Sequence, residues 1–177
     1  MTGRTRRLLA GGALALTMLT AAPAAASAAP ATSATTRGAR AHVVRASGEF
    51  TVALDVTSLR VQPVGTRCLL TVSGTLEFSG TLVGTAAATT AALEDATCAE
   101  VATHPPGTFA DVFRSTGTFA GTVDGQPVDA EIVYAGRTAV GGSIDAVMVF
   151  TGGVTGVLHV QAQVAVGGTY SGVLVER

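Results

Sequence analysis

The stretch that decides the fold is Phe150-Thr-Gly-Gly-Val-Thr-Gly-Val-Leu-His-Val-Gln-Ala-Gln-Val-Ala-Val-Gly-Gly-Thr-Tyr-Ser-Gly-Val-Leu-Val175. Apolar side chains alternate with others from Leu158 to Val166, which is the period of a strand with one buried face. Gly152-Gly153 and Gly167-Gly168 flank this run, and glycine readily adopts the positive φ angles of sharp turns. The pattern therefore predicts the last hairpin of an antiparallel sheet.

The same alternation recurs along most of the chain from Gly48 onward. Alternating or short extended stretches cover 50–57, 59–64, 68–79, 81–92, 109–123, 128–134, 144–150 and 158–166. Asp124-Gly125 is the strongest hairpin signal, whereas the alanine-rich residues 91–102 lack the 3.6-residue period of a helix. About eight strands with frequent turns predict an all-β fold, an eight-stranded antiparallel up-and-down barrel, because closure removes exposed edges. A two-sheet β-sandwich is the alternative.

The N-terminus has the features of an export signal. Three arginines within residues 4–7 precede an apolar run, 8–19, that is too short for a permanent membrane anchor. Ala26-Ser27-Ala28 fits the small-x-small cleavage rule, which predicts a secretory signal peptide over residues 1–28, with cleavage after Ala26 as the alternative. Residues 5–9 also approximate a twin-arginine signal, which leaves the export route open. We expect a secreted, extracellular protein with no membrane anchor after cleavage.

Beyond this signal the chain divides by composition. Residues 29–46 are rich in Ala, Thr, Ser, Pro and Arg, and predict a disordered linker or tail, while residues 47–177 form a single barrel domain. The signal contains three of the 11 basic residues and none of the 12 acidic residues, so its removal changes the formal charge from −1 to −4. An acidic surface without lysine excludes nucleic acid and anionic membranes as expected partners.

Two cysteines, Cys68 and Cys98, are present, and a disulfide persists in an exported protein. The closely spaced C-x-x-C motif of a reactive thiol pair is absent. We therefore predict a structural bridge between them. On the loop-entropy account, closing a loop of about 30 residues stabilises the fold by roughly 3 to 4 kcal/mol.

Several glycine-rich motifs in the second half of the chain carry a family resemblance. They are Gly117-Thr118-Phe119 with Gly121, the Asp124-Gly125 hairpin, residues 150–156, and residues 168–172. Together, over roughly residues 107–175, they resemble the closing half of the allene-oxide-cyclase-like barrels, a group that includes dirigent proteins and spirotetronate cyclases. The resemblance implies an eight-stranded antiparallel barrel that binds an apolar small molecule and, in some members, steers cyclisation or coupling without a cofactor.

Candidate site residues come from polar groups on apolar strand faces. Asp111 shares a strand face with the apolar side chains of Phe109 and Phe113. A carboxyl group on such a face must be paired with a cation, be hydrogen-bonded, or have a raised pKa. Asp111 could therefore serve as an acid or base. Alternatively, a bulge near Arg114 turns it outward or a rim arginine pairs with it. The predicted cavity lining is Phe50, Leu54, Leu70, Phe109, Asp111, Ile132, Tyr134, Met148 and Tyr170. For the tyrosines and Met148, simple core packing is the alternative.

The longest expected loop, 93–106, contains the Glu94-Asp95 pair and His104. The histidines lack metal-ligand spacing, and there is no phosphate loop or dinucleotide fingerprint, so we expect no metal and no cofactor. The first functional hypothesis is a secreted small-molecule-binding barrel with an apolar interior. An envelope interaction or structural protein with a filled barrel ranks second, and a cofactor-free cyclase or isomerase third.

Overall fold

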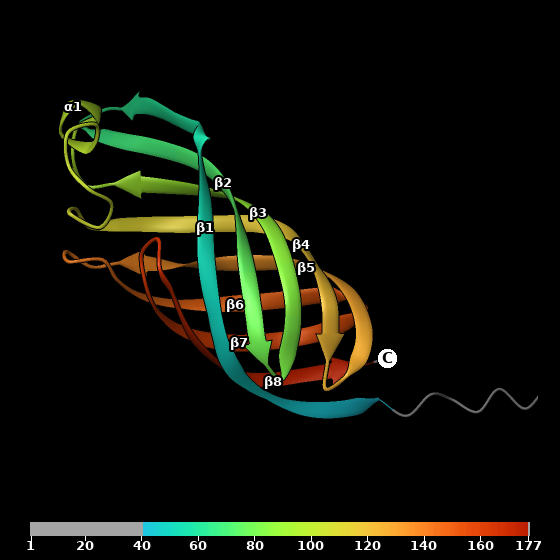
Figure 1. Ribbon diagram of the computed structural model, residues 1–177. Coiled ribbons are helices and arrows are strands. Elements are labelled where there is room, and N and C mark those ends of the chain that lie inside the picture. The colour runs from blue at the N-terminus through green and yellow to red at the C-terminus, as the bar shows by residue number, and fades with distance from the viewer. Residues whose placement is uncertain (1–40, 177) are drawn as a thin grey trace, which may run out of the picture. The chain divides into compact units, whose positions relative to one another are not determined.

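The computed structural model describes residues 41–176, which form one antiparallel sheet closed into a ring. The elements are β1 (His42–Val64), β2 (Arg67–Gly80), β3 (Leu82–Glu94), α1 (Cys98–Val101), β4 (Asp111–Val123), β5 (Gln126–Thr138), β6 (Ser143–Gly152), β7 (Val154–Gln163) and β8 (Gly167–Glu176). Each strand pairs with the next, and β1 pairs with β8 (Figure 1). The predicted all-β, eight-stranded antiparallel barrel is confirmed, and the sandwich alternative is not formed.

The barrel begins earlier in the chain than the composition predicts. Residues 42–46, assigned above to a disordered tail, are the start of β1 and pair with β8, beginning with His42 opposite Glu176. Val44 and Ala46 are buried in the barrel. Two inward side chains are too few to show a clear alternation, which is why composition misplaces this boundary. The predictions for the signal peptide, 1–28, and for residues 29–40 lie outside the described residues.

The two ends of the barrel are connected differently. At one end, here called the turn end, short turns link β2 to β3, β4 to β5 and β6 to β7. The predicted hairpin is present there, with Asp124 at φ 46° and Gly125 at φ 80°, two successive left-handed residues. At the other, the helix end, the connections range from the short β1–β2 and β7–β8 turns to the long segment with α1, which lies beside the β1–β2 turn (Figure 1).

Only the first half of β1 closes the ring. Residues 42–51 pair with β8, and after a last contact from the Val52 N–H to the Val166 carbonyl, β1 pairs with β2 alone. The register with β2 shifts between Asp55 and Arg60, where the Asp55 carboxylate accepts a hydrogen bond from the Thr57 N–H at 3.0 Å. The second half of β1 is therefore an edge, so the barrel wall is open on its β8 side near the helix end.

The connection between β3 and β4 contains a helix that periodicity does not reveal. α1 has four residues, too few to show a 3.6-residue repeat. It is held by a capping box: Thr97 accepts from the Glu100 N–H, and the Glu100 carboxylate accepts from the Thr97 N–H at 2.9 Å. β4 then starts at Asp111, two residues later than predicted. No helix within residues 41–176 has the length and hydropathy to cross a membrane.

The predicted disulfide between Cys68 and Cys98 is present, with the two Cα atoms 4.8 Å apart. It joins α1 to β2. Cys68 is fully buried, and its cross-strand partner is Glu94. The bridge therefore fixes the segment that leaves β3 at the helix end.

Aromatic and aliphatic side chains fill the turn-end half of the interior. Phe119 contacts Phe78 and Phe150 edge to face, with ring centroids 5.6 and 5.9 Å apart. Other side chains of this packed half are fully buried, among them Leu82, Val123, Met148, Leu158 and Leu174. These side chains form a packed core at the turn end, and the two cavities described below lie at the other end.

Tyr170 ties the packed half together across the barrel. Its hydroxyl donates to the Ser79 carbonyl and accepts from the Leu82 N–H, both at 2.9 Å. Gly48, opposite Tyr170 on β1, makes this possible because a Cβ there would collide with the Tyr170 hydroxyl and the Ser79 carbonyl. The strands β8, β2 and β3 are thereby linked through one buried side chain.

Candidate functional site

A cavity of about 510 Å³ occupies the helix-end half of the barrel. Its walls are mainly apolar side chains from β1, β2 and the segment preceding β4, and it reaches the opening between β1 and the β7–β8 turn. Six predicted site residues line it: Phe50, Leu54, Leu70, Phe109, Asp111 and Tyr134. The volume is within the range of small-molecule sites.

Three further predicted site residues, Ile132, Met148 and Tyr170, lie away from this cavity. They point inward as their strand parity indicates, but they are buried in the packed half, at exposures of 3% or less. Parity predicts which face of a strand a side chain occupies. It does not predict how far along the barrel axis the interior stops being filled.

Aromatic rings form the floor of the cavity. Tyr134 contacts Phe113 and Phe50 edge to face, with ring centroids 4.9 and 6.1 Å apart. The Tyr134 hydroxyl is buried and has no hydrogen-bond partner, and burial raises its pKa. Beside it the hydroxyls of Thr90 and Ser115 bond to each other at 2.6 Å. The floor is therefore apolar in area but contains three hydroxyl groups, one of them unsatisfied.

Two carboxyl groups lie at the rim of the cavity, and we call Glu94 and Asp111 the carboxyl pair. They are direct cross-strand partners on β3 and β4. Asp111 is 8% exposed, and its Oδ1 is buried without a hydrogen-bond partner. Burial, with a contribution from the charge of Asp111, raises the pKa of Glu94 to about 7. Burial also raises the pKa of Asp111, an effect that Thr138 partly offsets.

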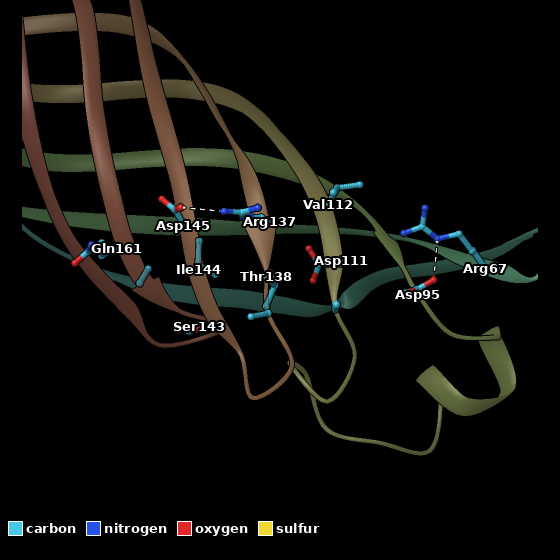
Figure 2. Close-up of a pocket in the computed structure, with 13 residues that line it drawn as sticks. Arg67, Asp95, Asp111, Val112, Arg137, Thr138, Ser143, Ile144, Asp145 and Gln161 are labelled. Carbon is cyan, nitrogen blue, oxygen red and sulfur yellow. Dashed lines mark ion pairs between the residues drawn. The ribbon is translucent and has the colours of Figure 1, made fainter.

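The arginines nearest in the rim are paired with other carboxylates, although the Arg67 Nε is buried without a hydrogen-bond partner. Arg67 donates to the Leu93 carbonyl at 3.0 Å and pairs with Asp95 at 3.6 Å. Arg137 turns toward Asp145 and pairs with it at 3.6 Å (Figure 2). Within residues 41–176 no ion pair reaches either member of the carboxyl pair, so neither sequence alternative for Asp111, an outward turn or pairing with an arginine, is seen.

The rim also forms a second, wider hollow of about 800 Å³ over the ends of β4 to β7 (Figure 2). It includes the two ion pairs of Arg67 and Arg137, and shares Asp111, Thr138, Ile144 and Ala162 with the inner cavity. Exposed ion pairs of this kind contribute little binding energy of their own. The inner cavity, enclosed by the strands, is therefore the better candidate site.

The histidines are dispersed. His104 lies at the cavity mouth, with Nδ1 2.8 Å from the Glu100 carbonyl and its ring edge to face with Phe109. His42 is 3.1 Å from the Glu176 carboxylate, and His159 is exposed on β7. In the part of the chain that the structure describes, no three His, Cys, Asp or Glu side chains are grouped so as to hold a metal ion.

Sequence reasoning missed Glu94 as an inward residue by placing it in a loop. The signal was available, because the inward parity of Ala86, Ala88, Thr90 and Ala92 extends to position 94. Its position opposite Asp111, in contrast, depends on how the α1 segment closes, which no local pattern encodes. The Thr90 and Ser115 hydroxyls were missed for a related reason, since short polar side chains are common on both faces of strands.

The comparisons with known proteins support the fold and nothing finer. No protein-family model and no curated protein matches the chain. A solved structure that is similar is a protein of unknown function from the DUF3224 family of Shewanella oneidensis MR-1, with 14% sequence identity and a TM-score of 0.54. The match covers 77% of this chain and 98% of that one. At this identity the likeness concerns the arrangement of strands.

Proposed function

We propose that this protein binds one apolar small molecule in the cavity at the helix end. The observation that carries the proposal is a hollow of about 510 Å³ with largely apolar walls and a few polar atoms, directly above a packed core. Removing apolar ligand surface from water in such a site is favourable by roughly 25 cal/mol per Å². The hollow also favours a binding protein over an interaction protein with a filled barrel.

The experiment uses N-phenyl-1-naphthylamine, an uncharged apolar dye whose fluorescence rises out of water. Ala162 lines the cavity, so Ala162→Phe should fill it and reduce dye affinity at least tenfold, equivalent to about 1.4 kcal/mol. The matched control is Ala120→Phe, at an exposed position on β4. Equal dye binding by both variants and the parent, with circular dichroism showing intact folds, would contradict binding in the cavity.

We also propose that the protein is exported. Support comes from the basic and apolar N-terminal pattern and from the disulfide, a bond typical of oxidising compartments. Expression of the full chain in a secreting bacterium, followed by N-terminal sequencing of protein from the medium, tests this. We expect a start at Ala29, or at Ser27 for the alternative cleavage site, whereas retention of residues 1–28 in the cytoplasm would contradict it.

A second candidate, a cofactor-free isomerase or cyclase as the family resemblance predicts, is favoured by the carboxyl pair. A half-buried carboxyl with a pKa of about 7 beside an apolar cavity suits proton transfer. The probe is 5-nitrobenzisoxazole: a carboxylate takes its ring C–H proton, the N–O bond breaks, and a cyanophenolate is released. We expect turnover that rises with pH through about 7 and is lost in Glu94→Gln. A rate no faster than with free acetate would contradict this candidate.

A further inference from the structure

We propose that the cavity selects a ligand with a protonated amine on an apolar body, and that the ammonium group lies between Glu94 and Asp111. The inference rests on the binding function proposed above and adds the chemical class of the ligand. It is drawn from three independent features of the cavity: its charge, its unsatisfied polar atoms, and the depth of its apolar part.

The first feature is the sign of the charge. The lining contains the carboxyl pair and neither arginine nor lysine, and the chain has no lysine at all. Its one basic side chain, His104, has Nδ1 within hydrogen-bond distance of the Glu100 carbonyl. A ligand carboxylate held between them would meet two acidic groups, and the nearest arginines, Arg67 and Arg137 in the adjoining rim hollow, are already paired with Asp95 and Asp145. An ammonium would instead reduce the repulsion between the two carboxyl groups.

The second feature is the set of unsatisfied atoms. Asp111 and Tyr134 are each 8% exposed, and Asp111 Oδ1 and the Tyr134 hydroxyl have no partner although both residues line the cavity. Leaving a buried polar atom unpaired costs free energy that a ligand donor would recover. An ammonium has three N–H donors, enough to bond both carboxyl groups at once, while an alcohol offers one.

The third feature separates an amine from a bare cation. A metal ion would find two carboxyl groups at the rim, and no third His, Cys, Asp or Glu joins them among the described residues. Below the pair the cavity continues as an apolar space bounded by Leu70, Phe113 and Phe50. A ligand that matches both parts has a charged head at the rim and an apolar body that extends toward Tyr134.

The test is displacement of N-phenyl-1-naphthylamine by three probes of equal chain length: octylamine, octanol and octanoate. At about pH 8 we expect octylamine to bind at least tenfold more tightly than octanol, in line with a charge-assisted hydrogen bond, and octanoate to bind most weakly. Glu94→Gln with Asp111→Asn should remove the preference for the amine without reducing octanol affinity. The control, Asp129→Asn with Glu131→Gln, changes two exposed carboxylates and should retain the preference.

A pH series identifies the groups responsible. The other titratable and charged groups of the two hollows are Arg67 on β2 with Asp95, Arg137 with Asp145, His104 before β4, and Tyr134 at the cavity floor. Because protonation of Glu94 removes one charge, the amine preference should shrink from about pH 8 to about pH 5. The shrinkage should persist in His104→Gln, which removes the one basic side chain of the cavity lining.

The outcomes separate the two proposals. If the dye binds but the three probes compete equally, or if the amine preference survives in the double variant, the amine assignment is wrong and the apolar binding site stands. If the dye and all three probes fail to bind the folded parent, both proposals fail. Should the double variant not fold, Glu94→Gln alone must lower the preference, and an unchanged preference would overturn the inference.

Discussion

The two halves of the barrel share eight strands and differ in what the strands carry inward. In the packed half, Phe119, Phe150 and Leu158 meet inside the ring and are almost fully buried. In the half with the cavity, here the hollow half, inward positions on β3 and β7 hold Ala92 and Ala162, and β1 has separated from β8. Closure of a sheet thus does not decide between core and cavity. In the hollow half, the small inward side chains on β3 and β7 and the departure of β1 from β8 leave the space open.

We expect the largest effect on the free energy of unfolding when one side chain is shortened in each half and the two variants are compared. Leu158→Ala removes a fully buried side chain from the packed half and should lower the free energy of unfolding by about 4 kcal/mol. Leu70→Ala shortens a partly exposed side chain that already borders empty space, and should cost about 1 kcal/mol. Urea unfolding followed by circular dichroism measures both. Equal losses would mean that the hollow half is collapsed and packed in solution.

The disulfide should matter most to the hollow half. Cys68→Ala with Cys98→Ala is expected to lower the free energy of unfolding by about 3 kcal/mol, because the open chain gains loop entropy. Dye affinity should fall as well, since Val101 and the residues after α1 line the cavity. The control is the parent protein before and after reduction with dithiothreitol. Full dye affinity after reduction would show that the bridge does not hold the cavity wall in place.

The two tyrosines form the next comparison. Tyr170→Phe leaves the buried Leu82 N–H and the Ser79 carbonyl without their partner, and should cost about 2 kcal/mol of unfolding free energy. Tyr134→Phe removes a hydroxyl that has no partner, so we expect a change within about 0.5 kcal/mol of zero, or a slight gain. Thermal and urea unfolding of the pair measure the difference. A large loss for Tyr134→Phe would reveal a bond made by its hydroxyl in solution.

The same contrast shows what the sequence predicts and what it does not. Alternation and glycine turns predict the ring order, the Asp124-Gly125 hairpin and most strand positions, because these depend on neighbouring residues. They divide the first strand wrongly, since residues 50–57 and 59–64, treated above as separate stretches, belong to one strand that runs from His42 to Val64. Alternation also places Asp111 and Tyr134 inward. It cannot separate Tyr134, which lines the cavity, from Tyr170, which lies in the core, because depth depends on packing by strands far apart in the sequence.

The carboxyl pair shows more clearly which contacts the sequence does not predict. Glu94 and Asp111 each lie at a strand end next to the long α1 connection. Their local sequence patterns therefore indicate a position near the end of the barrel, but they do not indicate that the two residues are partners. They become partners when β3 and β4 align in register, and that register is selected by many weak contacts along both strands. Hence the acidic group at position 111 is predictable from its apolar face. The burial of Glu94 beside Asp111, which raises the pKa of Glu94, is not.

The smallest effect that we expect is a change with pH in the free energy of unfolding, caused by the carboxyl pair. The pKa of Glu94 is about 7 in the folded protein and 4.5 ordinarily, so the folded state binds the proton more tightly than the unfolded chain. Its contribution to stability is therefore present below about pH 4.5 and is lost as the pH rises to about 7. Because Glu94 is only half-buried and partly screened by water, we expect a loss of about 1 kcal/mol.

In urea unfolding, Glu94→Gln should match the parent at about pH 4, where Glu94 is protonated in the folded protein and largely protonated in the unfolded chain. It should exceed the parent by about 1 kcal/mol at about pH 8. The control, Glu77→Gln, replaces an exposed carboxylate on β2 and should show the same offset at both pH values. Asp111 is present in both variants. A pH-dependent difference in unfolding free energy between Glu94→Gln and the parent therefore reports on Glu94 and on its interaction with Asp111. A pH-independent offset for Glu94→Gln would mean that Glu94 is neither buried nor beside Asp111 in solution. The hollow half would then lack the acidic rim that distinguishes it from the packed half.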